Sequence, residues 1–248
     1  MPRVFLPAVA TLLGMLAASS ARADCASGAV WAWPAPAAAL DPAGRVVLEA
    51  YGTDQAWVLD VAQLAPRLVS GSDTVPLRVV ESHRGSFEVA QVVLEAERPL
   101  RAGRTYRLAL TGRPAPTIWT GEKHAPLEWG VAAGASSPPR FRSAPRLDRT
   151  SFTAFGCGPA IYAHVAVDVD QPRRVQFRVW VEPTAAGPAV EYLVPAENGS
   201  LDIGHGMCSG PFTLTAGSSY RVTIAAVDAA GHETPAPGGP IAVVGPSP

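Results

Sequence analysis

The sequence predicts an all-β fold made of two tandem β-sandwich domains that follow an N-terminal signal peptide. Three observations support this: an apolar segment at the start of the chain, an internal repeat at an offset of 114 residues, and short runs of alternating apolar and polar residues. Proline, glycine, serine and aspartate separate these runs, as is typical of strands joined by tight turns. No later segment shows sustained helical periodicity, which argues against a mainly helical protein.

The first 23 residues have the features of a secretory signal peptide. Arg3 precedes an apolar run over residues 4–18, and Ala21 and Ala23 form an A-x-A cleavage site. The run is shorter than the ~20 apolar residues that a membrane-spanning helix needs. The residues directly before Cys25 do not match a bacterial lipobox, so we do not expect lipidation. We expect cleavage after Ala23, no transmembrane segment in the mature chain, and a secreted or periplasmic location.

The charge of the chain gives little information about partners. The formal net charge is −1, and removal of the signal peptide takes away two arginines and no acidic residue, which changes it to −3. Only 17% of the residues are charged, and the sequence has no basic stripe of the kind that follows a phosphate backbone. We therefore expect no nucleic-acid partner.

The internal repeat relates residues 100–110 to residues 214–224. In both copies a leucine is followed by glycine, then by tyrosine, then by apolar residues at every second position. Glycine permits the positive φ of a turn, and a tyrosine here can pack its ring on the core while its hydroxyl bonds to the backbone of the turn. The glycines are Gly103 and Gly217, and the tyrosines are Tyr106 and Tyr220. The offset corresponds to one sandwich domain per copy.

The pattern L-x-x-G-x-x-Y-x-[VL]-x-[IL] resembles the region between strands E and F of fibronectin type III and related bacterial immunoglobulin-like domains. After the second copy, residues 226–233 resemble the turn between strands F and G of such domains, although His232 stands where asparagine is common. The resemblance implies a first sandwich domain over residues 24–132 and a second over residues 140–248. The proline-ended stretch 133–139 is expected to be a stiff linker.

Short runs rich in strand-forming residues occur throughout both halves. In the first half they cover residues 46–51, 56–61, 77–80, 88–95, 106–110 and 127–131. In the second half, apolar residues occupy every second position over residues 161–169 and again over residues 175–181, which predicts two strands with one buried face each. Pro172 lies between these two strands, so we expect the turn of a hairpin there.

Three cysteines remain after cleavage, and we expect Cys157 and Cys208 to form a disulfide because both lie in the second domain of an exported chain. Closing a loop of this size would stabilise the domain by ~4 kcal/mol. The alternative is a metal site made of these cysteines and His205, but it lacks a fourth ligand and a Cys-x-x-Cys pair. Cys25 is left over, and it is free, bonded to another chain, or paired with one of the other two.

Five of the six tryptophans lie before the predicted linker. They are Trp31, Trp33, Trp57, Trp119 and Trp129. Exposed aromatic rings bind sugars or peptides, and Trp31 and Trp33, two residues apart, would point the same way on a strand. The alternative is that these tryptophans are core and edge residues of a sandwich with few other aromatic residues.

Motifs of enzymes and of bound cofactors are missing from the sequence. It contains no G-x-S-x-G elbow, H-E-x-x-H pair, Walker loop or dinucleotide-binding glycine pattern. Glu122, His124 and Glu128 lie near one another and would be the candidates for an active site close to the linker. Asp168 and Asp170 offer too few oxygens for calcium. We therefore predict no catalytic residues, no cofactor and no metal site.

These observations favour a non-enzymatic structural or protein-binding module of the bacterial envelope or medium. The partner would be an envelope or extracellular protein, or a polysaccharide. One alternative is a carbohydrate-binding accessory protein that uses the first-domain tryptophans, and a further one is an enzyme with a site near the domain junction. The architecture itself does not choose between them, because one fold supports many functions.

Overall fold

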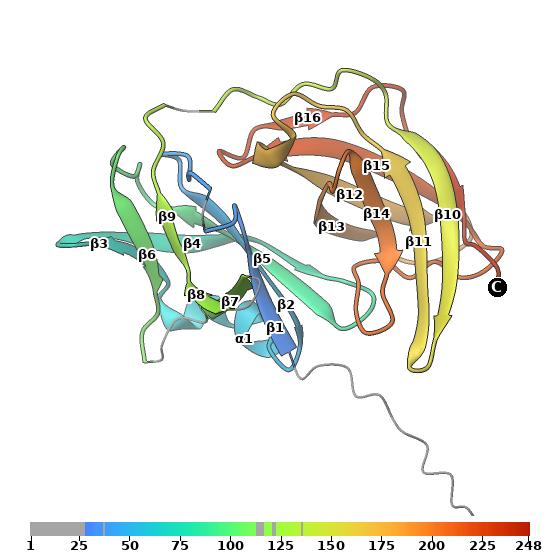
Figure 1. Ribbon diagram of the computed structural model, residues 1–248, viewed down its shortest axis with the longest axis horizontal. Coiled ribbons are helices and arrows are strands. Elements are labelled where there is room, and N and C mark those ends of the chain that lie inside the picture. The colour runs from blue at the N-terminus through green and yellow to red at the C-terminus, as the bar shows by residue number, and fades with distance from the viewer. Residues whose placement is uncertain (1–27, 37, 113–116, 121–122, 135) are drawn as a thin grey trace, which may run out of the picture.

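The computed structural model describes residues 28–248, apart from residues 37, 113–116, 121–122 and 135. The fold is mostly β with several sheets, which confirms the predicted all-β class. Two groups of strands lie side by side, one coloured blue to green and the other yellow to red (Figure 1). We call them the N-terminal half, up to residue 132, and the C-terminal half. The predicted signal peptide falls outside the described residues, and within them no helix is long and apolar enough to cross a membrane.

Seven strands of the N-terminal half form one antiparallel path in the order β1-β2-β5-β4-β3-β6-β9. They are β1 (Gly28–Trp33), β2 (Arg45–Gly52), β3 (Arg67–Ser70), β4 (Asp73–Arg84), β5 (Val89–Ala96), β6 (Thr105–Ala109) and β9 (Glu128–Gly130). A separate hairpin pairs β7 (Thr117–Thr120) with β8 (Lys123–Pro126). β1 is an edge strand of the path among the described residues, and β7 lies close to it.

β4 lies in the middle of this path and joins its two parts, because the strand bends. Its first residues pair with β3, its residues from Leu77 on pair with β5, and a β-bulge separates Val79 from Glu81 in the second register. A bulge bends a strand and increases its twist, so the sheet curls around one core. Tyr106 and Trp129 are the largest fully buried side chains of that core.

The prediction of a strand over residues 56–61 is wrong, because this segment is helical. α1 (Gln55–Leu59) is followed by a short 3₁₀ helix, η1 (Val61–Leu64). Trp57, Val58 and Val61 are buried in the first core, and their spacing places them on one face of a helix. A short apolar run fits a buried strand and a helical turn equally well, and only its packing against the sheet distinguishes them.

The C-terminal half consists of two sheets. One has the order β10-β11-β14, and the other has the order β13-β12-β15-β16 with β17 also paired to β15. Their strands are β10 (Arg146–Phe155), β11 (Gly158–Ala166), β12 (Val175–Pro183), β13 (Val190–Pro195), β14 (Ser200–His205), β15 (Ser219–Asp228), β16 (Glu233–Pro235) and β17 (Ile241–Val244). One buried cluster takes Val165 and Leu201 from the first sheet and Phe177 from the second, so the sheets enclose a common core.

The burial of the apolar positions predicted for residues 161–169 and 175–181 is confirmed, but two other predictions are wrong. The second row of residues 175–181 does not face solvent, because Gln176 and Arg178 are buried. The hairpin predicted at Pro172 is also wrong. The apolar positions of both strands are buried. However, β11 pairs with β10 and β14, whereas β12 pairs with β13 and β15, so the chain crosses between the sheets through the short 3₁₀ helix η2 (Pro172–Arg174). Both strands face the same core, and alternation therefore cannot tell a hairpin from a crossover.

The turn geometry predicted from the internal repeat is confirmed in both copies. The backbone N–H of Arg101 donates to the hydroxyl of Tyr106 at 3.3 Å, and that of Thr215 donates to the hydroxyl of Tyr220 at 2.8 Å. The glycines between them have φ values of 73° and 72°, where a side chain would be strained. The repeat thus encodes the same tyrosine-closed turn at equivalent places in the two halves.

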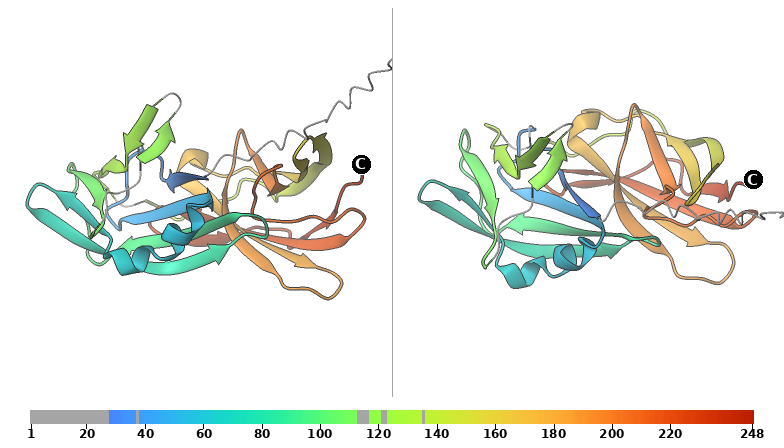
Figure 2. Two further views of the ribbon diagram at one scale, coloured as in Figure 1. Left: turned by 90° about the horizontal axis from the view of Figure 1, so that it is seen from below. Right: turned by 60° about the horizontal axis from the view of Figure 1, so that its bottom comes forward.

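The two halves are packed against each other. Val47 and Val93 of the N-terminal half form a small buried cluster with Leu193 and Val227 of the C-terminal half. Gln91, which is 1% exposed, donates from Nε2 to the carbonyl of Leu193 at 3.0 Å and accepts from the N–H of Leu193 at 3.1 Å. This paired contact fixes β5 against β13. The two halves lie side by side in both views of Figure 2.

The segment predicted to be a linker also bonds to both halves. The N–H of Ser136 donates to Asp41 Oδ2 at 2.6 Å, and its hydroxyl lies 2.9 Å from Asp228 Oδ2. Asp228 in turn accepts from the backbone of the turn between β15 and β16. These bonds and the packed boundary hold the halves in one arrangement.

Candidate functional site

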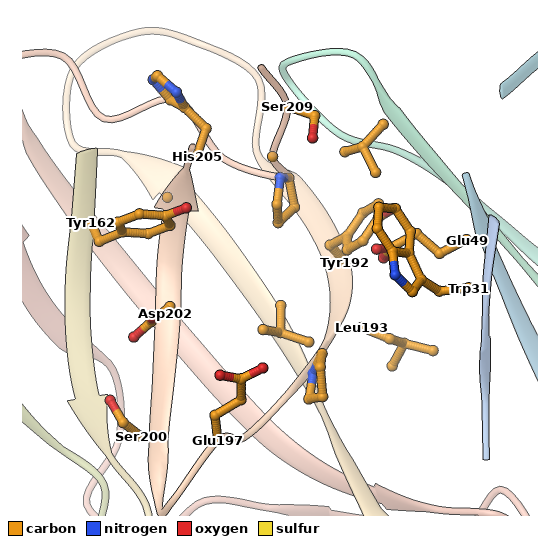
Figure 3. A pocket seen from close by; sticks show the side chains of 16 residues that line it. Trp31, Glu49, Tyr162, Tyr192, Leu193, Glu197, Ser200, Asp202, His205 and Ser209 are labelled. Atoms are coloured by element: carbon orange, nitrogen blue, oxygen red, sulfur yellow. The ribbon is translucent and has the colours of Figure 1, made fainter. Parts of the chain in front are cut away.

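A cleft lies where the two halves meet. Two hollows, of about 260 Å³ and about 630 Å³, share the lining residues Trp31, Glu49, Tyr162, Pro195 and Glu197, so they are parts of one space. We call it the inter-half cleft. Its walls come from β1 and β2 on one side, and from β11, β13, β14 and the turn before β14 on the other (Figure 3).

The N-terminal wall is aromatic. Trp31 and Trp33 both line the larger hollow, as does Ala32 between them. Trp31 is 42% exposed, and its ring stacks on Tyr51 with the centroids 5.2 Å apart and the planes at 28°. Stacking on Tyr51 holds the indole in place, so that its flat face is available to a ligand.

The polar groups of the cleft include three carboxylates, which we call the cleft acids: Glu49, Glu197 and Asp202. Glu49 lies opposite Trp31 in the register of β1 and β2. Figure 3 shows Glu197 and Asp202 across the cleft from Trp31 and Glu49. None of the described residues that line the cleft is a lysine or an arginine.

Glu49 has an unusual environment for a carboxyl group. Burial raises its pKa to about 7, although the neighbouring Tyr192 and Gln91 act in the opposite direction. Gln91 Nε2 donates to Glu49 Oε2 at 3.3 Å, so the residue that joins the halves also contacts this carboxyl group. Burial, and then the charge of Glu49, raise the pKa of the Tyr192 hydroxyl. Glu49 is thus partly protonated near neutral pH.

The cleft also contains an unsatisfied hydrogen-bond acceptor. Gln176 lines the larger hollow and is only 4% exposed, yet its Oε1 has no hydrogen-bond partner among the described residues. A buried carbonyl oxygen without a donor costs ~1–3 kcal/mol. A donor group from a ligand would remove this cost.

A second acidic cluster at the boundary differs from the cleft because arginines occupy it. Carboxylate and imidazole atoms of Glu81, His83 and Glu191 lie within 4.8 Å of one another, which is compatible with metal binding. However, Arg178 binds Glu81 at 2.8 Å and Glu233 at 2.9 Å and also pairs with Glu191, and the side chain of Arg178 is only 9% exposed. We call this group, together with Arg45, the Arg178 cluster.

The guanidinium of Arg178 takes the place that a metal ion would need. Burial opposes ionisation of Glu81, but hydrogen bonds from His83 and Arg178 and the charges of Arg178 and Arg45 together lower its pKa. Arg45 Nη2 lies 2.5 Å from Glu81 Oε1. The cluster therefore already contains its cations, and it joins β4 of one half to β12, β13 and β16 of the other.

The remaining tryptophans do not join Trp31 and Trp33. Trp57 and Trp129 are buried in the first core, and Trp129 Nε1 donates to the carbonyl of Pro34 at 2.7 Å. For Trp119 only the backbone is described, and it lies opposite His124 in the hairpin of β7 and β8. The four tryptophans whose side chains are described are therefore divided between the first core and the cleft.

The predicted disulfide between Cys157 and Cys208 is wrong. Cys157 is a free thiol, and its Sγ lies 3.0 Å from Met207 Sδ, so the methionine next to Cys208 occupies the facing position. Cys208 has a different bonding partner. Cys25 lies outside the described residues. The metal site considered for the same loops gains no support, because His205 Nδ1 contacts the carbonyl of Gly206 at 2.7 Å.

The other polar candidates from the sequence have local roles or are not described. Asp170 Oδ1 accepts from the N–H of Arg140 at 2.8 Å, and Asp168 pairs loosely with Arg142 at 3.9 Å. Glu122 and the side chain of His124 lie outside the described residues, and Glu128 is exposed on β9.

Side chains on three neighbouring strands form a hydrogen-bonded series, Ser151, His164 and Asp202, that was not predicted from the sequence. Ser151 Oγ lies 2.8 Å from His164 Nε2, and His164 Nδ1 lies 2.7 Å from Asp202 Oδ1. The order of groups resembles that of a serine hydrolase. However, Ser151 lies within the paired strand β10, away from a loop that could gather N–H donors for an oxyanion, and the aspartate is 53% exposed. We interpret this hydrogen-bonded series as a network that orients Asp202 at the wall of the cleft.

No protein-family model matches the chain, and no curated protein matches it. Among solved structures, the chain is similar to a crystal structure of pullulanase type I from Bacillus subtilis str. 168 complexed with maltose, at 10% sequence identity and a TM-score of 0.26. The match covers 79% of this chain and 24% of the pullulanase chain. At this TM-score the likeness carries no argument about fold or function.

Proposed function

We propose that the chain is an exported, non-enzymatic binding module and that the inter-half cleft is its binding site. In this proposal two sandwich domains of immunoglobulin-like or fibronectin type III-like type, over residues 24–132 and 140–248, present the cleft to a protein partner in the periplasm or medium. The observation that carries the proposal is the exposed Trp31 ring, held by Tyr51 beside the cleft.

The fixed arrangement of the halves also supports a binding role. Gln91 and Ser136 tie the halves together, and the apolar cluster around Val47 and Leu193 closes the boundary beneath the cleft. A preformed site loses less conformational entropy when a ligand binds. The volume of the larger hollow, about 630 Å³, is in the range typical of ligand sites.

Carbohydrate binding is a second candidate, and the presence of both Trp31 and Trp33 in the lining of the larger hollow favours it. Sugar rings stack on exposed indoles while their hydroxyls bond to carboxylates. This proposal uses two of the five tryptophans named from the sequence rather than a broad aromatic face.

A pull-down from the envelope and medium of the source organism tests the binding role. The mature wild-type protein would be compared with Trp31→Ala and with Phe155→Ala, which removes an aromatic ring that is 48% exposed and does not line the cleft. We expect a stoichiometric partner to be retained by the wild type and by Phe155→Ala and to be lost with Trp31→Ala. Equal retention by all three proteins would place the binding surface elsewhere.

A further inference from the structure

We propose that the inter-half cleft recognises the guanidinium group of an arginine side chain presented by a partner protein. This inference rests on the proposed binding function and names the chemistry of its ligand. It follows from the kind of polar groups that the cleft contains, from their charge, and from the aromatic ring beside them.

The first step concerns hydrogen bonding. Glu197 and Asp202 offer carboxylate oxygens, and Gln176 offers a buried Oε1 that has no partner among the described residues. All of these atoms are acceptors. A guanidinium carries five N–H donors and no acceptor, so it complements them.

The second step concerns charge. The cleft acids face a space whose described lining contains no lysine or arginine. Elsewhere on the same boundary, the carboxylates of the Arg178 cluster are paired with two arginines of the chain itself. An arriving arginine would give Glu197 and Asp202 a cation of the kind that Arg178 gives to Glu81, in addition to the contact that Asp202 makes with His164.

The third step concerns shape. Trp31 presents a flat, supported ring at the same space that Glu49 and Glu197 line. A planar guanidinium stacks on indole while its edge donates to carboxylates, which the compact ammonium of lysine does less well. The size of the cleft suits one side chain and a short stretch of its backbone rather than a domain surface.

The test is a titration of the mature, oxidised full chain, followed by tryptophan fluorescence and by calorimetry. The probes are the capped peptide Gly-Arg-Gly-Arg-Gly, the same peptide with citrulline in place of arginine, and maltotriose. Citrulline is the uncharged counterpart of arginine. We expect the arginine peptide to bind about tenfold or more tightly than the citrulline peptide, and the difference to shrink in high salt.

Two variants test whether the arginine peptide binds in the inter-half cleft. Glu197→Gln removes a cleft charge and is expected to weaken binding of the arginine peptide about tenfold. Glu128→Gln removes an exposed charge outside the cleft and is expected to leave binding unchanged. Melting curves confirm that both variants fold, and Asp202→Asn is a second cleft variant if Glu197→Gln does not fold.

The outcomes separate this inference from the proposed function. Two results would overturn the arginine inference: equal binding of the arginine and citrulline peptides, or binding of maltotriose alone. If Trp31→Ala abolishes that binding, the cleft remains the binding site. If no probe binds and Trp31→Ala also retains every partner in the pull-down, both the inference and the proposed function are wrong.

Discussion

The boundary between the halves has two groups of carboxylates, and they differ in whether arginine side chains pair with them. In the Arg178 cluster, arginines of the chain neutralise the carboxylates and the charges are used to join the halves. At the cleft acids, no lysine or arginine is present in the described lining. This difference is the basis of our proposal that one group serves stability and the other serves recognition.

The pKa values of two glutamates express the same contrast. Hydrogen bonds from His83 and Arg178 keep the pKa of Glu81 low against the effect of burial, whereas burial raises the pKa of Glu49 to about 7. Both are glutamates on neighbouring parts of the N-terminal half. Their neighbours in the folded protein, not their residue type, decide their charge at neutral pH.

Removal of the central arginine should have the largest effect. Arg178→Met leaves Glu81, Glu191 and Glu233 without their shared cation, and we expect the free energy of unfolding at pH 7 to fall by ~3–5 kcal/mol. Urea denaturation measures this. Arg221→Met is the control, since it breaks an exposed pair with Glu182 and should cost less than ~1 kcal/mol. Similar losses in the two variants would contradict a structural role of the Arg178 cluster.

Glu49→Gln should raise the free energy of unfolding, in contrast to Arg178→Met, which lowers it. A raised pKa means that folded Glu49 holds its proton between its ordinary pKa of 4.5 and about 7, so the wild type loses stability as the pH rises through this window. We expect Glu49→Gln to be more stable than the wild type by roughly 2 kcal/mol at pH 8, with little difference at pH 4. Urea denaturation at both pH values tests this, and a constant difference would show that Glu49 does not titrate in this way.

The pH dependence of ligand binding is the next test. If a cationic ligand needs ionised Glu49, binding of the arginine peptide should strengthen about tenfold from pH 6 to pH 8. Other titratable groups face this carboxyl group or line the cleft: Glu197, Asp202, His205, Tyr162 and Tyr192. Glu49→Gln must therefore flatten the profile if the effect is to be assigned to Glu49. An unchanged profile in that variant would assign the pH dependence to another group of the cleft.

The smallest effect is expected at the connecting segment. Ser136→Ala removes the hydroxyl that contacts Asp228, and we expect a loss of ~1 kcal/mol in the free energy of unfolding. Ser137→Ala, at the exposed neighbouring residue, should change it by less than about half as much. Chemical denaturation of the two variants would show whether this contact helps to hold the halves beside the cleft. If Ser136→Ala loses no more stability than Ser137→Ala, the contact contributes nothing.

Part of the candidate site could be predicted from the sequence. The spacing of Trp31 and Trp33 predicted a common direction for their side chains, because side chains two residues apart on a strand share a face. Glu49, Gln176 and Glu197 were not singled out, since each is one polar residue in or beside an apolar run. The only available signal was that Glu49 interrupts the strand predicted over residues 46–51.

The sequence by itself determined the features that depend on local patterns: the all-β class, the alternating strands and the two tyrosine-closed turns at Tyr106 and Tyr220. Only the tertiary structure decided that residues 55–64 are helical, that β11 and β12 lie in different sheets, and that Cys157 is free. It also decided which carboxylates meet an arginine and which face the cleft. The physical reason is the distance along the sequence over which each effect acts. Propensity and alternation depend on residues within a few positions of one another. Burial, ion pairing and cavities depend on segments that are far apart in the chain.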